Sequence, residues 1–223
     1  MRGFAWFVVA SMSIATAACG GSTQEAAKTL AAPDLVTEGG LERLLPSPAD
    51  VNTAMRATGM TVVEPMNEMW DNTSEVLASE CRYVDGPAEA PVYAGTGWTA
   101  VRGGALHQPG DFTHFAGLVV VQFPSSDQAA AFIATSAERW PACSNRQFTS
   151  SQPGQPDVVW AVGPVANSNG TLVVTKTRQD ASAWSCERAL TARKNVAIDV
   201  IACGASPAGS AVALAQQIAA TIS

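Results

Sequence analysis

The sequence is poor in charged residues, and those it has are scattered. Asp, Glu, Lys and Arg make up 14% of the 223 residues, with 13 Lys and Arg against 19 Asp and Glu, a formal net charge of −6. No run of cationic residues stands out along the chain. Nucleic-acid binding depends on clustered cations that neutralise phosphates. We therefore expect no nucleic-acid partner.

Sequence patterns of common catalytic sites are also missing. There is no Gly-x-Ser-x-Gly segment of the kind that positions a nucleophilic serine, and only two histidines could act as bases. Gly95 and Gly97 are followed by Trp98, without the third glycine or the lysine of a phosphate-binding loop. We therefore expect no enzyme activity and no cofactor.

One short stretch carries residues that bind metals in other proteins. His107, Asp111 and His114 lie close together in the sequence, and zinc sites use such ligands. The stretch also contains Pro109-Gly110, a pair that is typical of a turn. We interpret it as a turn between two strands with exposed polar side chains, and we expect no metal site.

The N-terminal region has the pattern of a secretory signal. The uncharged stretch after Arg2 covers residues 3–18, which is 16 residues, whereas a membrane-spanning helix needs roughly 20. A charged start, an apolar middle and small residues before Cys19 together predict a signal peptide over residues 1–18.

Cys19 directly follows the small residues, which is the position of the lipid-bearing cysteine in a bacterial lipobox. Thr16 stands where such a motif usually has Leu. The alternative is an ordinary cleaved signal followed by a free cysteine, but an odd cysteine in a secreted protein needs an explanation. We expect Cys19 to be the lipid anchor and residues 19–40 to be a flexible linker. The protein would then lie on the extracytoplasmic side of the cell membrane, held there by its lipid.

The remaining residues, 41–223, contain three helix patterns. Ser47 before Pro48 is typical of a helix start. Ser125 followed by Gln128 is the pattern of a capping box. The expected helices cover residues 48–58, 126–140 and 207–222, with a helical turn near 88–93.

Strand patterns alternate with turn residues through the same region. The expected strands cover residues 61–64, 98–102, 114–123, 147–151, 158–162, 171–177, 186–192 and 196–203. The unbroken apolar run 118–121 indicates a central strand, because such a strand is covered on both faces. Helices packed around five or more antiparallel strands define an α+β domain over residues 41–223.

Four cysteines follow the N-terminal one, and four cysteines allow three pairings. If residues 194–195 form a two-residue hairpin turn, residues equally distant from the turn face each other, which places Cys186 opposite Cys203. Directly opposite strand positions lie within disulfide range. Cys81 is then left to pair with Cys143. An envelope location is oxidising enough for both bonds.

Motifs spread over this region resemble a known family. In chain order they are Cys81, Pro91–Gly97 (Pro-Val-Tyr-Ala-Gly-Thr-Gly), Pro109–Asp111, Phe123-Pro124, Phe132, Thr135–Ala137, Trp140, Cys143, Trp184–Cys186 and Cys203-Gly204. Together they resemble the PknH-like extracellular domain. That domain is the sensor module outside the membrane in a mycobacterial receptor Ser/Thr kinase, and it also occurs alone in mycobacterial lipoproteins.

The resemblance covers about residues 41–223 and carries expectations of its own. It implies an antiparallel sheet with helices, the same two disulfides, and a V-shaped cleft that binds a ligand. The expected function is a non-catalytic sensor-type domain that binds a small or amphipathic ligand of the cell envelope. The alternative is a protein-interaction module that modulates a receptor kinase or an envelope assembly through an envelope protein partner.

The candidate cleft residues are aromatic and cationic side chains on or near the expected strands. They are Tyr93, Trp98, Arg102, Trp160 and Arg178. An arginine beside an aromatic ring can hold an anionic group while the ring covers an apolar body, so an anionic lipid or glycan fragment is the first expected ligand. Trp98 and Arg102 share parity and are expected to face the same side. Burial in the core is the alternative for the tryptophans.

Overall fold

The structure is a computed structural model that describes residues 34–72, 75–110, 112–180 and 183–223. The expected signal peptide, Cys19 and the linker up to Pro33 lie outside the described residues. Asp34–Ser223 form one compact unit. Within that unit, no described helix combines the length and the apolar character that crossing a bilayer requires.

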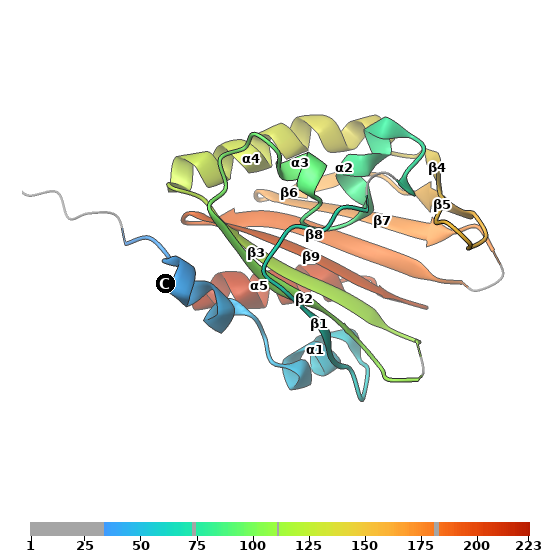
Figure 1. Ribbon diagram of the computed structural model, residues 1–223, viewed down its shortest axis with the longest axis horizontal. Helices are drawn as coiled ribbons and strands as arrows, with labels where there is room; N and C mark the ends of the chain where they lie inside the picture. The colour runs from blue at the N-terminus through green and yellow to red at the C-terminus, as the bar shows by residue number, and fades with distance from the viewer. Residues whose placement is uncertain (1–33, 73–74, 111, 181–182) are drawn as a thin grey trace, which may run out of the picture. The chain divides into compact units, whose positions relative to one another are not determined.

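An antiparallel sheet of nine strands forms the centre of this unit, in the order β1-β2-β3-β9-β8-β7-β5-β4, with β6 paired to β7 (Figure 1). The strands are β1 Thr61–Met66, β2 Ala100–His107, β3 Phe115–Gln122, β4 Gln147–Ser150, β5 Val158–Val162, β6 Ala166–Ser168, β7 Thr171–Arg178, β8 Ser185–Arg193 and β9 Val196–Gly204. The expected antiparallel α+β fold is confirmed.

Helices cover both faces of the sheet. The helices are η1 Glu38–Leu44, α1 Pro48–Met55, η3 Ser79–Cys81, α2 Arg82–Asp85, α3 Ala90–Tyr93, α4 Ser126–Arg139, η4 Trp140–Cys143 and α5 Ser210–Thr221. One face carries α2, α3 and α4, and the other carries α5, α1 and η1 (Figure 1). We call them the α4 face and the α5 face.

Strand alternation explains how one sheet supplies two cores. In β3, Val119 and Val121 belong to the core of the α4 face, whereas Leu118 and Val120 belong to the core of the α5 face. The expected central position is confirmed, because β3 lies between β2 and β9. In β9 every residue is buried, as expected of a strand covered on both faces.

Several helix ends differ in detail from the sequence expectation, and α5 begins at Ser210, three residues after the expected start. Arg56 adopts a left-handed conformation (φ 53°) and ends α1 at Met55, three residues before the expected end. Ser125 caps α4 by accepting a hydrogen bond from Gln128 N. The reciprocal capping box is instead found at Ser47, where Asp50 supplies the second bond.

The folded domain begins before the expected boundary at residue 41. Val36 N donates to Asn195 Oδ1 at 2.8 Å, and Val36 O accepts from Gln122 Nε2 at 2.7 Å. Leu41 in η1 is fully buried in the core of the α5 face. Residues 36–40 of the expected linker therefore belong to the domain.

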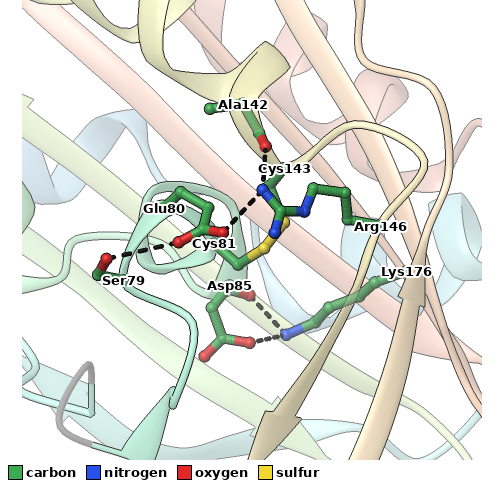
Figure 2. Close-up of a disulfide and its surroundings, with 8 residues drawn as sticks. All are labelled: Ser79, Glu80, Cys81, Asp85, Ala142, Cys143, Arg146 and Lys176. Atoms are coloured by element: carbon green, nitrogen blue, oxygen red, sulfur yellow. Dashed lines mark hydrogen bonds and ion pairs between the residues drawn. A yellow bond between two sulfur atoms is a disulfide. The ribbon is translucent and has the colours of Figure 1, made fainter.

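Both disulfides join the expected partners. In the β8–β9 hairpin, Cys186 pairs directly with Cys203, because the turn falls at residues 194–195. Cys81 in η3 is bonded to Cys143 in η4. Figure 2 shows this second bond beside Arg146, whose guanidinium contacts both Ala142 O and the Glu80 carboxylate.

Candidate functional site

A cleft of about 460 Å³ lies on the α4 face, between one end of the sheet and the chain segment that precedes β2. Its floor is formed by side chains of six strands: Ala105, Phe115, Trp160, Lys176, Cys186, Ile201 and Cys203. These positions lie near the same end of the sheet. Toward the opposite end, Val119, Val121 and Leu190 pack in the core of the α4 face, to which Phe132 of α4 also belongs. The cleft is thus the part of this face that α4 leaves uncovered.

One side of the cleft is the wall segment, residues 82–93, which includes α2 and α3. Trp70 pairs with it through two backbone bonds, from Trp70 N to Ala88 O (3.0 Å) and from Ala90 N to Trp70 O (2.6 Å). Gly117 of β3 lets Trp70 and Pro87 pack closely on the sheet: a Cβ there would lie 3.0 Å from Ile201, 3.3 Å from Pro87 and 3.4 Å from Trp70, tighter than most Cβ contacts.

A buried ion pair holds the wall segment to the sheet. Arg188 of β8 and Asp199 of β9 form a bidentate pair, with Nε–Oδ1 at 2.9 Å and Nη2–Oδ2 at 2.8 Å. Asp199 also accepts from Ala88 N and from the Tyr93 hydroxyl, while Arg188 donates to Tyr83 O. Three groups of the wall segment therefore bind one buried pair of charges on the floor.

This network fixes the position and the chemistry of Tyr93. The side chain is fully buried, and its hydroxyl lies 2.9 Å from Asp199 Oδ2. Burial, followed by the negative charge of Asp199, raises the pKa of Tyr93 well above its usual value. Tyr93 is therefore a neutral donor that helps anchor the wall, and it lies outside the cleft lining.

Lys176 is the only cationic side chain that lines the described part of the cleft. Its ammonium group donates to Asp85 O at 2.7 Å and forms an ion pair with the Asp85 carboxylate (Figure 2). The same ammonium lies 4.6 Å from the ring centroid of Trp160, within the range of a cation–π interaction. Its charge is thus matched within the protein.

Three further carboxylates line the cleft: Glu64, Glu75 and Glu89. Glu89 is only 2% exposed and accepts from Asn72 N (2.7 Å) and Asn72 Nδ2 (3.2 Å). Burial raises the pKa of Glu89, although the two bonds from Asn72 act in the opposite direction. Glu75 accepts from Gln152 Nε2 at 2.8 Å.

Aromatic rings line another part of the cleft, which we call the aromatic rim. Phe112 is 57% exposed, and its ring stacks on Trp184 with centroids 5.7 Å apart. Phe115 of β3 lies beside it, with its centroid 6.0 Å from that of Phe112. With Trp70 and Trp160, these rings give the cleft a broad apolar surface.

Of the five residues expected in the cleft, the structure places only Trp160 there. Tyr93 is in the core. Trp98 precedes β2 and packs half-buried against the core of the α4 face. Arg102 lies on the α5 face, where it pairs with Glu38 at 2.8 Å.

The expectation that Trp98 and Arg102 share a face is therefore wrong, because β2 begins at Ala100 and strand parity does not extend back to Trp98. Arg178 lies opposite Trp160 in the β5–β7 register, but its guanidinium pairs with Asp180 at 2.7 Å. The expected arginine and aromatic pair for an anionic ligand is not assembled in the cleft.

The histidine-rich turn has polar contacts of its own. His107 Nδ1 lies 2.9 Å from Gln108 O, and its ring packs against Phe112 at 4.9 Å. His114 Nδ1 lies 3.0 Å from Gln108 Nε2. Asp111 lies outside the described residues, and among those described no group of three His, Cys, Asp or Glu side chains could hold a metal ion.

Taken together, the fold and the site define a class: an antiparallel α+β domain with two disulfides and a lined cleft on one face of its sheet. Such disulfides are typical of proteins outside the reducing cytoplasm. The family model of the PknH-like extracellular domain matches residues 36–221, and the chain belongs to this family. As a member of a family of extracellular domains, the domain is extracytoplasmic.

Relatives of known sequence and structure agree with this assignment. The chain is 34% identical over 178 residues to the serine/threonine-protein kinase PknH of Mycobacterium tuberculosis (strain H37Rv) and to that of Mycobacterium bovis. The match covers 79% of this chain but only 28% and 30% of those kinases, so the chain spans less than a third of their length. The crystal structure of the extracellular domain of PknH from M. tuberculosis superposes with a TM-score of 0.80 at 32% identity, covering 84% of this chain and 97% of that one.

Proposed function

We propose that this domain is a non-catalytic binding module that takes a small or amphipathic ligand into the cleft on the α4 face. The observation that carries the proposal is the cleft itself, in which aromatic surface and a few polar groups converge on about 460 Å³. Ligand sites in proteins have this size and this mixture of surfaces. The buried Arg188–Asp199 pair and the Cys81–Cys143 bond hold the wall segment in place, so the site is formed before a ligand arrives.

A cleft-filling substitution tests this function directly. Ala105 lies on the floor and is 5% exposed, so Ala105→Phe would place a ring inside the cleft. Wild-type protein incubated with a detergent extract of its own cell envelope should gain thermal stability, and Ala105→Phe should not. Ala166→Phe on the exposed strand β6 is the matched control and should behave as wild type. If the extract stabilises all three proteins equally, or none of them, the cleft is not the binding site.

The location proposed for this module is the outer side of the cell membrane, with a lipid on Cys19. The support is the small-residue segment that ends directly before Cys19. Changing Cys19→Ser should release the protein from the membrane fraction. A mature N-terminal peptide with an unmodified thiol at Cys19 would contradict the anchor and leave the cleft proposal untouched.

A second candidate function, interaction with an envelope protein, is favoured by the edge strand β1. This strand ends the sheet, and its Val62 and Val63 are 51% and 42% exposed. An open edge with exposed apolar side chains can pair with a strand of a partner. Cross-linking in intact cells compares the wild type with Val62→Lys: loss of a cross-linked protein in the variant would support this function, and an unchanged pattern would reject it.

A further inference from the structure

The charges that line the cleft do not balance. Its described lining contains four carboxylates, those of Glu64, Glu75, Asp85 and Glu89, and the single ammonium group of Lys176. That ammonium is paired with Asp85. None of the ion pairs in the described part of the chain involves the other three carboxylates. An excess of negative charge in a cleft draws positive charge toward it.

The rings in the cleft favour the same kind of ligand. The face of an aromatic ring attracts a cation within about 6 Å of its centroid. Lys176 shows this inside the cleft, because its ammonium lies 4.6 Å from the ring centroid of Trp160. Phe112 and Trp184 add a stacked pair at the rim, where an apolar body can be covered.

The lining of the cleft disfavours an anionic ligand. An anion would lie among carboxylates without a cationic partner, and two unit charges about 6 Å apart repel by about 3 kcal/mol at an effective dielectric constant of 20. The arginines that could have offset this charge lie elsewhere, since Arg102 is paired on the α5 face and Arg178 with Asp180.

We propose that the cleft binds an organic cation: a protonated amine or quaternary ammonium group carried on an apolar body. This inference rests on the proposed function of the cleft and specifies its ligand class. The ammonium group would lie toward Glu64 and Glu75, and the apolar body would lie against the aromatic rim.

Three probes with the same hexyl chain test the ligand class on the wild-type protein. They are hexyltrimethylammonium, hexanesulfonate and hexyl glucoside, which are cationic, anionic and neutral. Binding is followed by tryptophan fluorescence, because three tryptophans line the cleft, and by the shift in Tm. Hexyltrimethylammonium should change both signals at concentrations where the other two leave them unchanged.

A charge-neutralising variant then tests the carboxylates. The double variant Glu64→Gln/Glu75→Gln should weaken hexyltrimethylammonium binding about tenfold, which corresponds to about 1.4 kcal/mol. The control Glu42→Gln/Glu138→Gln removes the same charge from exposed positions outside the cleft and should bind as wild type. Far-UV circular dichroism confirms that each variant is folded.

The outcomes separate the ligand class from the proposed function. Equal or stronger binding of hexanesulfonate or hexyl glucoside overturns the cationic class, and so does the absence of any response to hexyltrimethylammonium. If the envelope extract still stabilises the wild type and not Ala105→Phe, the binding function stands with a ligand of another class. If neither the probes nor the extract act through the cleft, both proposals fall.

Discussion

The two faces of the sheet are covered by different kinds of contacts. On the α5 face, Leu214, Ala215 and Ile218 of α5 are fully buried against apolar side chains of β3, β8 and β9. On the α4 face, the helix α4 covers only part of the sheet, and the wall segment approaches the rest through polar contacts with Arg188 and Asp199. Apolar packing of α5, α1 and η1 closes the α5 face, whereas short turns held by polar groups leave a cleft on the α4 face.

The disulfides follow the same division. Cys81 and Cys143 lie in the core of the α4 face, and Cys186 and Cys203 lie in the floor of the cleft. The described core of the α5 face contains no disulfide cysteine. Apolar packing of α5, α1 and η1 stabilises that face, while the α4 face combines apolar packing with covalent bonds and a buried ion pair. The face that carries the proposed site thus depends on specific bonds, each of which can be removed singly.

The largest expected effect is the loss of one partner of the buried ion pair. Asp199→Ala leaves the Arg188 guanidinium buried without its carboxylate and should lower the free energy of unfolding by about 3–5 kcal/mol. Urea denaturation measures this, with Asp157→Ala as an exposed control that should change stability by less than about 0.5 kcal/mol.

The double variant Arg188→Met/Asp199→Leu sharpens this test. It replaces both charges by apolar groups and should recover part of the lost stability, because no buried charge remains uncompensated. If Asp199→Ala is as mild as Asp157→Ala, the ion pair does not anchor the wall segment.

Removing the disulfides should affect stability unequally. In the chain-entropy model, the Cys81–Cys143 bond, with a sequence separation of 62, stabilises by about 4 kcal/mol, and the Cys186–Cys203 bond, with a separation of 17, by about 3 kcal/mol. The variant Cys81→Ala/Cys143→Ala should therefore unfold at a lower urea concentration than the variant Cys186→Ala/Cys203→Ala. Equal losses, or a larger loss for the hairpin bond, would show that strain or residual structure outweighs loop entropy.

On the α5 face, the most sensitive polar contact is the cap of α5. Glu187 of β8 accepts from Gly209 N at 2.8 Å and from Ala211 N at 2.9 Å, in place of a capping side chain that Gly209 lacks. Glu187→Ala should lower the free energy of unfolding by about 1–2 kcal/mol. Arg193→Ala, exposed at the end of the same strand, is the control. An unchanged stability in Glu187→Ala would show that packing alone holds α5.

The sequence predicts the regular elements better than the site, for a physical reason. Strands such as β3 and helices such as α4 carry periodic apolar patterns, and the hairpin register follows from the turn at residues 194–195, which also places Cys186 opposite Cys203. The wall segment has no period, because it is held by single contacts, three of them with residues more than 100 positions away. Tyr93, for example, is held by Asp199.

The cleft lining was missed for the same reason. Glu89 and Asp85 lie in a segment rich in Gly and Pro that resembles an exposed loop, and only tertiary contacts bring them to the sheet. Arg102 was expected in the cleft because it follows Trp98 at a strand-like spacing, but the strand begins two residues after Trp98. The one available signal was the alternating pattern of β7, which places Lys176 on a buried face next to Cys186.

The smallest expected effect concerns Glu89 and the pH dependence of the α4 face. Burial raises the pKa of Glu89 above its ordinary value of 4.5, with a further increase from Asp85 and a decrease from the charge of Arg188. The folded state therefore holds a proton on Glu89 at a pH where the unfolded state has released it. The stabilisation from this proton is complete below the unfolded pKa and is lost as the pH rises through the folded pKa.

Glu89→Gln removes this titration while keeping a neutral side chain of the same shape. Its stability relative to wild type should therefore be lowest at pH 4 and should rise as the pH increases above about 4.5. The test is the urea midpoint of Glu89→Gln and of wild type, measured between pH 4 and pH 8. A difference between Glu89→Gln and wild type that stays constant over this range would mean that the Asn72 bonds offset the burial of Glu89 and that its pKa is the same in the folded and unfolded states.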